Sequence, residues 1–151
     1  MATKYQGTEK EVRALNALIN MMRASDALTS SLQRELAGTR LTPSQFGTME
    51  ALLHLGPLRQ GELAKKLLRC CGSITAVVEG LERRGLVERE READDSRFVR
   101  VTLTDKGRKL IQKIFPTHVQ TVSKRFSALT NHEQEEMRRL CRKLGKSITE
   151  A

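Results

Sequence analysis

Apolar residues recur at three- and four-residue steps over the first quarter of the chain, the spacing of a long amphipathic helix that ends near Gly38. The residues that carry this pattern are Leu15, Ile19, Met22, Leu28, Leu32 and Leu36. Further on, Thr42, Pro43 and Gln45 form a capping box with a proline at the first helical position. This box predicts a second helix, which runs to about Leu55.

Two shorter segments with apolar residues at helical spacing follow the second helix. They cover residues 61–68 and about 72–84, and only a few residues separate them. Two short helices with a tight join are typical of a helix-turn-helix. We therefore expect this motif near the middle of the chain.

A two-stranded hairpin is predicted after Gly85, where the apolar period changes from helical spacing to alternation. Its strands are residues 86–92 and 97–104, joined by the polar turn 93–96. Within the first strand, residues 88–92 alternate between glutamate and arginine. We interpret this run as a solvated strand edge that discourages aggregation, rather than as a binding patch.

The last third of the chain predicts two further helical segments. Thr104 and Asp105 provide an N-cap and an acidic first turn for one of them, and Pro116 is expected to kink or break it. A capping box from Thr130 to Glu133 opens the last helix. The apolar residues on one face of this helix are Met137, Leu140, Leu144 and Ile148. The predicted fold class is therefore mainly α with a small β-hairpin.

Composition narrows the class of partner. The 151-residue chain carries a formal net charge of +9, which suits a polyanion such as nucleic acid or an anionic membrane surface. One compact domain is expected at this length. The chain has no apolar run of about 18 residues, and its N-terminus is polar, so neither a membrane span nor an export signal is predicted. Cytoplasmic localisation is the expectation that follows.

Residue types that often carry catalysis or metal binding are not arranged for either role. Cys70, Cys71 and Cys141 include no CxxC pair, and the histidines are far apart, so we predict neither a disulfide framework nor a metal site. We find no nucleophile with a base and an orienting group, and no phosphate-binding loop, at a recognisable spacing. The sequence therefore predicts that the chain is not an enzyme and uses no cofactor.

A series of short motifs spans the predicted helix-turn-helix and hairpin. In order they are Glu62-Leu63-Ala64, Ile74-Thr75, Leu81-Glu82, Gly85-Leu86-Val87, Asp95-x-Arg97 and Val101-x-Leu103-Thr104-x-x-Gly107. This series resembles the MarR family of bacterial transcriptional regulators, and flanking helices of the expected number extend the resemblance over about residues 8–150. The resemblance implies a winged helix-turn-helix DNA-binding region over 41–104. It also implies helical dimerisation regions over 1–40 and 105–151, all within one compact domain.

The resemblance further implies that double-stranded DNA is the partner. In that family the second helix, here residues 72–84, enters the major groove, and the arginine of the wing, here Arg97, reaches into the minor groove. The residues predicted to contact DNA are Arg69, Gly72, Ser73, Thr75, Ala76 and Arg97. An alternative for Arg97 is a surface ion pair with Asp95, which would contribute little.

The chain departs from the family pattern around this helix. Ala76 stands where a long basic side chain is common, so base readout is expected to be weaker or to shift to other residues. Cys70 occupies the usual serine N-cap position, and a thiol is a poor hydrogen-bond acceptor. Ser73 is the alternative cap, for a shortened helix.

A homodimer is predicted because a small wing domain cannot cover the apolar faces of the first and last helices. Two-fold symmetry then predicts a pseudopalindromic operator with half-sites about one helical turn apart. The resemblance implies a repressor that a small aromatic or phenolic effector releases from DNA. Two alternatives stay open: an adaptor that makes only protein contacts, and redox sensing at Cys70 and Cys71, where a helix N-terminus and Arg69 favour a thiolate.

Overall fold

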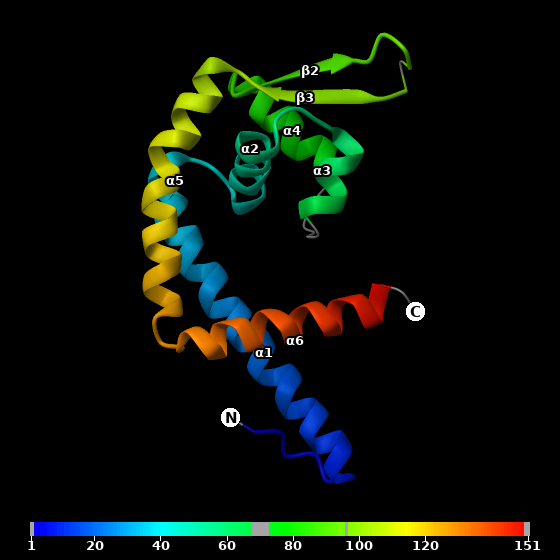
Figure 1. Cartoon of the computed structure of the whole chain (residues 1–151), viewed down its shortest axis with the longest axis vertical. Coiled ribbons are helices and arrows are strands. Elements are labelled where there is room, and N and C mark those ends of the chain that lie inside the picture. The colour runs from blue at the N-terminus through cyan, green and yellow to red at the C-terminus, as the bar shows by residue number, and fades with distance from the viewer. Residues whose placement is uncertain (1, 68–72, 96, 150–151) are drawn as a thin grey trace. The chain divides into compact units, whose positions relative to one another are not determined.

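The computed structural model describes residues 2–67, 73–95 and 97–149, a mainly helical chain with a small antiparallel sheet (Figure 1). The helices are α1 Glu9–Leu36, α2 Pro43–Leu55, α3 Gln60–Leu67, α4 Ile74–Arg83, α5 Asp105–Phe126 and α6 Asn131–Thr149. The strands are β1 Leu58–Arg59, β2 Val87–Arg91 and β3 Val99–Leu103, and the 3-10 turn Ala37–Thr39 follows α1. The predicted class, mainly α with a β-hairpin after a helix-turn-helix, is confirmed. The chain divides into two compact units, Met1–Pro116 and Thr117–Ala151.

Capping boxes set the starts of helices in both units. Gln45 N donates to Thr42 Oγ1 over 3.1 Å at the start of α2, and Glu133 N donates to Thr130 Oγ1 over 3.3 Å at the start of α6. In each box the acidic or amide side chain returns the bond to the backbone of the cap residue. Both predicted boxes are confirmed. A third box, at Thr8, starts α1 earlier than its apolar pattern indicates.

The sheet has three strands in the order β1-β3-β2. The hairpin of β2 and β3 is confirmed, with Arg89 opposite Val101. β1 was not predicted, because two residues are too few to show an alternating pattern. It exists through its pairing with β3, which sets Arg59 opposite Arg100.

The buried core of the first unit joins the helix-turn-helix to the sheet. Its fully buried apolar side chains include Leu52, Leu63, Val78, Leu81, Leu86, Val87, Val101 and Ile111. They come from α2, α3, α4, α5 and the strands of the hairpin or the residue just before it. Burying one such side chain contributes roughly 1.5–3 kcal/mol. The core therefore holds the helix pair and the hairpin as one body.

Two glycines of the motif series have specific structural roles. Gly85 ends α4 with a φ of 66°, a conformation that side-chain-bearing residues rarely adopt, and Leu86 N then donates to Leu81 O over 3.0 Å. At Gly107, an added Cβ would overlap the carbonyl oxygen of Leu86. That carbonyl oxygen also accepts a hydrogen bond from Thr104 N over 3.1 Å. The start of α5 is thus packed directly against the backbone that enters β2.

Pro116 lies inside α5, which continues to Phe126. Of the expected kink or break, the break is wrong. A proline removes one backbone donor and crowds the preceding turn, which costs stability without ending the helix when the rest of the segment is helical.

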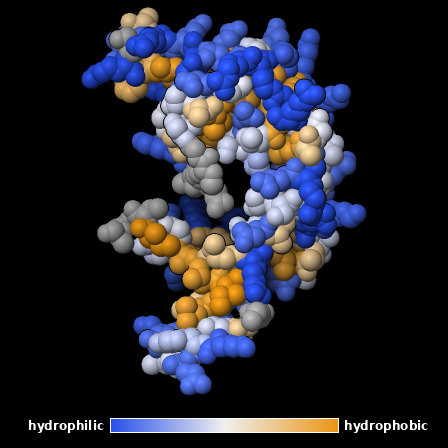
Figure 2. Space-filling view, turned by 180° about the vertical axis from the view of Figure 1, so that it is seen from behind, coloured by the Kyte–Doolittle hydropathy of each residue, from blue (hydrophilic) through white to orange (hydrophobic). Residues whose placement is uncertain are grey.

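Large apolar side chains remain on the surface of α1 and of α6. In α6, Leu140 is 50% exposed and Ile148 is 68% exposed. In α1, Leu18 is 49% exposed and Met22 is 52% exposed. Such side chains appear in orange on the surface in Figure 2. Each helix presents an apolar face that its own unit leaves uncovered.

Candidate nucleic-acid interface

The first turn of α4 is capped by Ser73. Its hydroxyl oxygen accepts from Thr75 N over 3.2 Å, and its extended backbone, with φ −59° and ψ 131°, places it just outside the helix. This confirms the alternative in which Ser73 caps a shortened helix. Cys70 lies outside the described residues.

Side chains at the start of α4 differ in their exposure. Ser73 and Ala76 are exposed, whereas Thr75 is partly buried. The Oγ1 atom of Thr75 accepts a hydrogen bond of 2.8 Å from Gln60 Nε2 at the start of α3. This bond links the two helices of the motif. Of the predicted contacts in this region, Arg69 and Gly72 lie outside the described residues.

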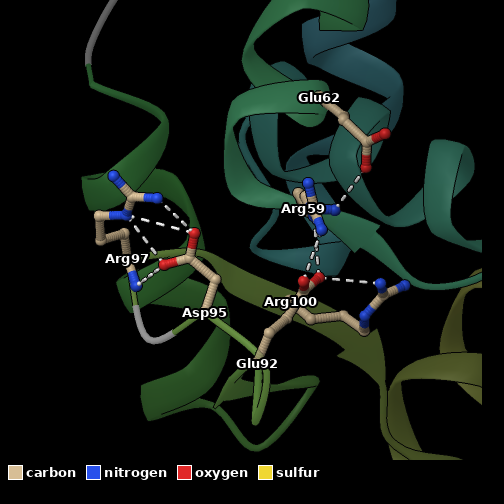
Figure 3. A network of polar contacts seen from close by, with 6 residues as sticks. All are labelled: Arg59, Glu62, Glu92, Asp95, Arg97 and Arg100. Carbon is tan, nitrogen blue, oxygen red and sulfur yellow. Dashed lines mark hydrogen bonds and ion pairs between the residues drawn. The ribbon is translucent and has the colours of Figure 1, made fainter.

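Arg97 stands at the tip of the wing with 83% of its side chain exposed. Its Nε and Nη2 atoms donate to Asp95 Oδ1 and Oδ2 over 2.9 and 2.7 Å (Figure 3). Its backbone N donates to the same carboxylate over 3.1 Å. These bonds hold the pKa of Asp95 below its ordinary value and raise that of Arg97. The ion pair considered as an alternative is present, and it orients a guanidinium that still faces solvent.

A second ion-pair group lies at the end of the β2–β3 ladder next to the turn of the wing, and it was not predicted from the sequence. Glu92 accepts from Arg59 Nε over 2.9 Å and from Arg59 Nη2 over 2.6 Å, and Arg100 Nη2 donates to it over 2.8 Å (Figure 3). The side chain of Glu92 is only 14% exposed. The two bonds from Arg59 lower the pKa of Glu92 and raise that of Arg59. Arg59 and Glu92 are 33 residues apart, so no local pattern signals their contact.

The alternating charged run in β2 is only partly a solvated edge. Glu88 and Glu90 are exposed, in line with that interpretation. It is wrong for Glu92 and for Arg89, whose Nη2 atom lies 2.6 Å from Glu82 Oε2 on α4. The strand alternation turns Arg89 towards α4, so its charge is used to join β2 to the helix.

Two basic residues hold backbone carbonyl groups around the end of α4. Arg84 Nη1 donates to Arg40 O over 2.8 Å, and Arg84 Nη2 donates to Thr39 O over 3.2 Å. Lys106 Nζ in turn donates to Arg84 O over 2.7 Å. The end of α4 is therefore bonded to the link between α1 and α2 and to the start of α5.

In the part of the chain that the structure describes, no helix combines the length and apolar character needed to cross a bilayer. Within the same residues, no group of three or more histidine, cysteine, aspartate or glutamate side chains could hold a metal ion. The wing and the start of α4 form the candidate site.

Comparisons with known proteins agree with this geometry. The sequence model of the MarR family matches residues 41–99, from just before α2 to the start of β3. The chain is 33% identical over 138 residues to YkoM, an uncharacterized HTH-type transcriptional regulator of Bacillus subtilis strain 168, covering 91% of this chain and 90% of YkoM.

Solved structures show the same fold. AbsC, a MarR family transcriptional regulator from Streptomyces coelicolor, superimposes with a TM-score of 0.84 at 21% identity, covering 99% of this chain and all of AbsC. BpsR of Bordetella bronchiseptica gives 0.77 at 26% identity, covering 85% of this chain and 98% of BpsR. The BpsR structure addresses how 6-hydroxynicotinic acid regulates DNA binding by that protein.

Proposed function

Since the chain belongs to the MarR family of transcriptional regulators, we propose that it represses transcription by binding a pseudopalindromic operator in double-stranded DNA as a homodimer. It is a regulator of transcription and not an enzyme. The observation that carries the proposal is a single buried core that holds two elements in one unit. These are a capped α4 that exposes Ser73 and Ala76 at its start, and a wing whose Arg97 side chain is 83% exposed.

The start of α4 is proposed to read the major groove. The hydroxyl groups of Ser73 and Thr75 would bind phosphates or base edges, and Ala76 would contact a thymine methyl group. Arg69 and Gly72 are proposed as further contacts on the family resemblance alone. Because Ala76 has no polar group, we expect base recognition on this helix to rest on few hydrogen bonds.

Arg97 is proposed to enter the minor groove next to the site read by α4. A narrow minor groove concentrates negative potential, which attracts a guanidinium. Asp95 already holds the Arg97 side chain through two bonds of 2.9 and 2.7 Å. Less conformational entropy is therefore lost when Arg97 binds DNA.

Residues 41–104 are proposed as the DNA-binding region, and residues 1–40 and 105–151 as the dimerisation region. The support is the apolar surface of α1 and α6, where Leu18 and Leu140 are 49% and 50% exposed in the single chain. Apolar faces of this kind usually mark an interface. A two-fold dimer would present its two α4 helices to half-sites about one helical turn apart.

We also propose a small aromatic or phenolic effector that lowers the affinity for the operator. The support is the likeness to BpsR, at 26% identity, whose DNA binding is regulated by 6-hydroxynicotinic acid. Titration of a panel of small aromatic acids and phenols into the protein–operator complex tests this point. If none of these compounds releases the operator, the result would count against an effector of this class.

The central test is selection of duplexes from a random library with the purified full chain. We expect a pseudopalindromic motif, an affinity that falls steeply with salt, and binding of Arg97→Ala that is about tenfold or more weaker with a salt slope smaller by about one. Arg138→Ala is the matched control, because Arg138 also pairs with a carboxylate nearby, Glu135 at 2.9 Å, and is 67% exposed. Failure to retain any duplex at low salt would contradict the proposal and favour the protein-binding adaptor.

A further inference from the structure

Arg59 contacts both sides of the hairpin where its two strands enter the turn at the tip of the wing. Glu92 is the residue after β2, and it receives two hydrogen bonds from the Arg59 guanidinium, at 2.9 and 2.6 Å. Phe98 is the residue before β3, and its ring centre lies 4.2 Å from Arg59 Cζ. The same guanidinium therefore binds one strand through its edge and the other through its face.

Arg59 is itself fixed to the helix-turn-helix. It belongs to β1, directly before α3, and its backbone N donates to Glu62 Oε2 in α3 over 2.7 Å. A two-stranded hairpin alone is marginally stable and bends easily. Through Arg59, the turn end of this hairpin is bonded to α3, the helix before α4.

Glu92 also separates two like charges. Arg59 and Arg100 occupy paired positions on β1 and β3, and like charges directly opposite each other destabilise a sheet. Glu92 accepts from both, so its carboxylate makes this pairing favourable. Without the carboxylate, two guanidinium groups would face each other near the turn end of the hairpin and push β1 and β3 apart.

From this arrangement we infer that Arg59 and Glu92 are positioning residues for DNA binding, which set where the wing carries Arg97 relative to α4. The inference rests on the function proposed above. Arg97 lies one residue before Phe98, so a shift of Phe98 relative to Arg59 also moves the backbone of Arg97. Neither Arg59 nor Glu92 needs to touch DNA for this role.

The test compares Glu92→Gln with Glu88→Gln in the full-length protein on the operator that it selects. Glu88 is a matched control, because it is a glutamate of the same hairpin, in β2, and it is exposed. Each change removes one negative charge, which by itself would strengthen DNA binding. We expect Glu92→Gln to weaken operator binding about tenfold and Glu88→Gln to leave it within about twofold of the wild type.

Arg97→Ala is then combined with each variant. If Glu92 positions Arg97, the loss caused by Arg97→Ala falls from about tenfold in the wild type to about threefold or less in the Glu92→Gln background, while it stays near tenfold in the Glu88→Gln background. A role in general stability alone would not produce this difference. Thermal unfolding of each variant shows that the compared proteins are folded.

Equal losses in Glu92→Gln and Glu88→Gln, or an undiminished effect of Arg97→Ala in the Glu92→Gln background, would overturn the inference. Should Glu92→Gln not fold, Arg59→Lys and Arg59→Ala decide the matter. Lysine keeps the positive charge but lacks the planar guanidinium with its paired N–H donors, so Arg59→Lys should bind DNA with an affinity between those of the wild type and Arg59→Ala. Wild-type affinity in Arg59→Ala would refute the role. A wild-type protein that retains no duplex would refute the proposed function, and this inference with it.

Discussion

The proposed DNA-binding region buries its apolar residues, whereas the last helix leaves several of its own exposed. In the region of α2, α3, α4 and the hairpin, Leu63, Val78 and Val101 are fully buried. In α6, Leu140 and Ile148 are 50% and 68% exposed. Both regions use the same capping box to start a helix. The difference between them is therefore tertiary: the first region buries its apolar residues in a core within one chain, whereas α6 leaves an apolar face exposed, which supports the proposed dimer.

Placing a charge on the apolar face of α6 should have the largest effect. We expect Leu140→Glu to raise the dimer dissociation constant about a thousandfold, because burying an unpaired carboxylate in an interface costs several kcal/mol. Sedimentation equilibrium measures this constant. The control is Arg142→Glu, two positions on and so on the opposite side of the helix. A Leu140→Glu variant as dimeric as the wild type would remove the contrast between the two regions.

A substitution at Gly107 should disrupt the proposed DNA-binding region and leave α6 intact. Gly107→Ala should lower the free energy of unfolding by about 3 kcal/mol or more, since the new Cβ would overlap Leu86 O and backbone must move. Urea unfolding followed by circular dichroism tests this. Gly61→Ala is the control, because nothing lies within 4 Å of its added Cβ, and it should stay within about 1 kcal/mol of the wild type. Equal stability of the two variants would contradict the close packing at Gly107.

Removing one helix N-cap from each region tests whether capping stabilises α2 and α6 to the same extent. Thr42→Ala and Thr130→Ala should each cost about 1 kcal/mol, because each leaves the same backbone donor unsatisfied. Urea unfolding measures both. Thr117→Ala, an exposed position inside α5, should be neutral or slightly stabilising. If one cap cost far more than the other, local signals would differ between the regions after all.

Acid should weaken the wing through its ion pairs, with the smallest effect. Hydrogen bonds from Arg59 hold the pKa of Glu92 below its ordinary value of 4.5. A carboxylate whose pKa is lower in the folded state than in the unfolded state stabilises the fold at pH values above about 4.5. This contribution is lost as the pH falls through the pKa of the folded state. We expect the melting temperature to fall on acidification below this range, and to fall less in Glu92→Gln. Glu88→Gln, an exposed residue of β2, should keep the wild-type dependence; an identical profile for both variants would argue against the Glu92 contribution.

The sequence could predict the helices and the hairpin because their signals are local. Thr42 with Gln45 marks the start of α2, and the helix ends at Gly56 with a φ of 78°. The change from helical spacing to alternation after Gly85 marks the wing. Each of these depends on residues within a few positions of one another, where periodicity and capping operate.

The features that could not be predicted depend on contacts between distant segments. β1 has two residues and forms only because β3 pairs with it. Arg59 meets Glu92 across 33 positions, and the alternating run that contains Glu92 looks the same in sequence whether it is solvated or paired. The DNA contacts proposed at Arg69 and Gly72 rest on family resemblance, since they lie outside the described residues.

Arg84 holds the carbonyl oxygens of Thr39 and Arg40, and not their side chains. Every residue type offers a carbonyl, so side chains at these two positions can be exchanged while the bond persists. The main constraint is conformational, because Arg40 has a φ of 57°, which glycine and asparagine adopt most easily. The link between α1 and α2 can therefore diverge during evolution without loosening the end of α4.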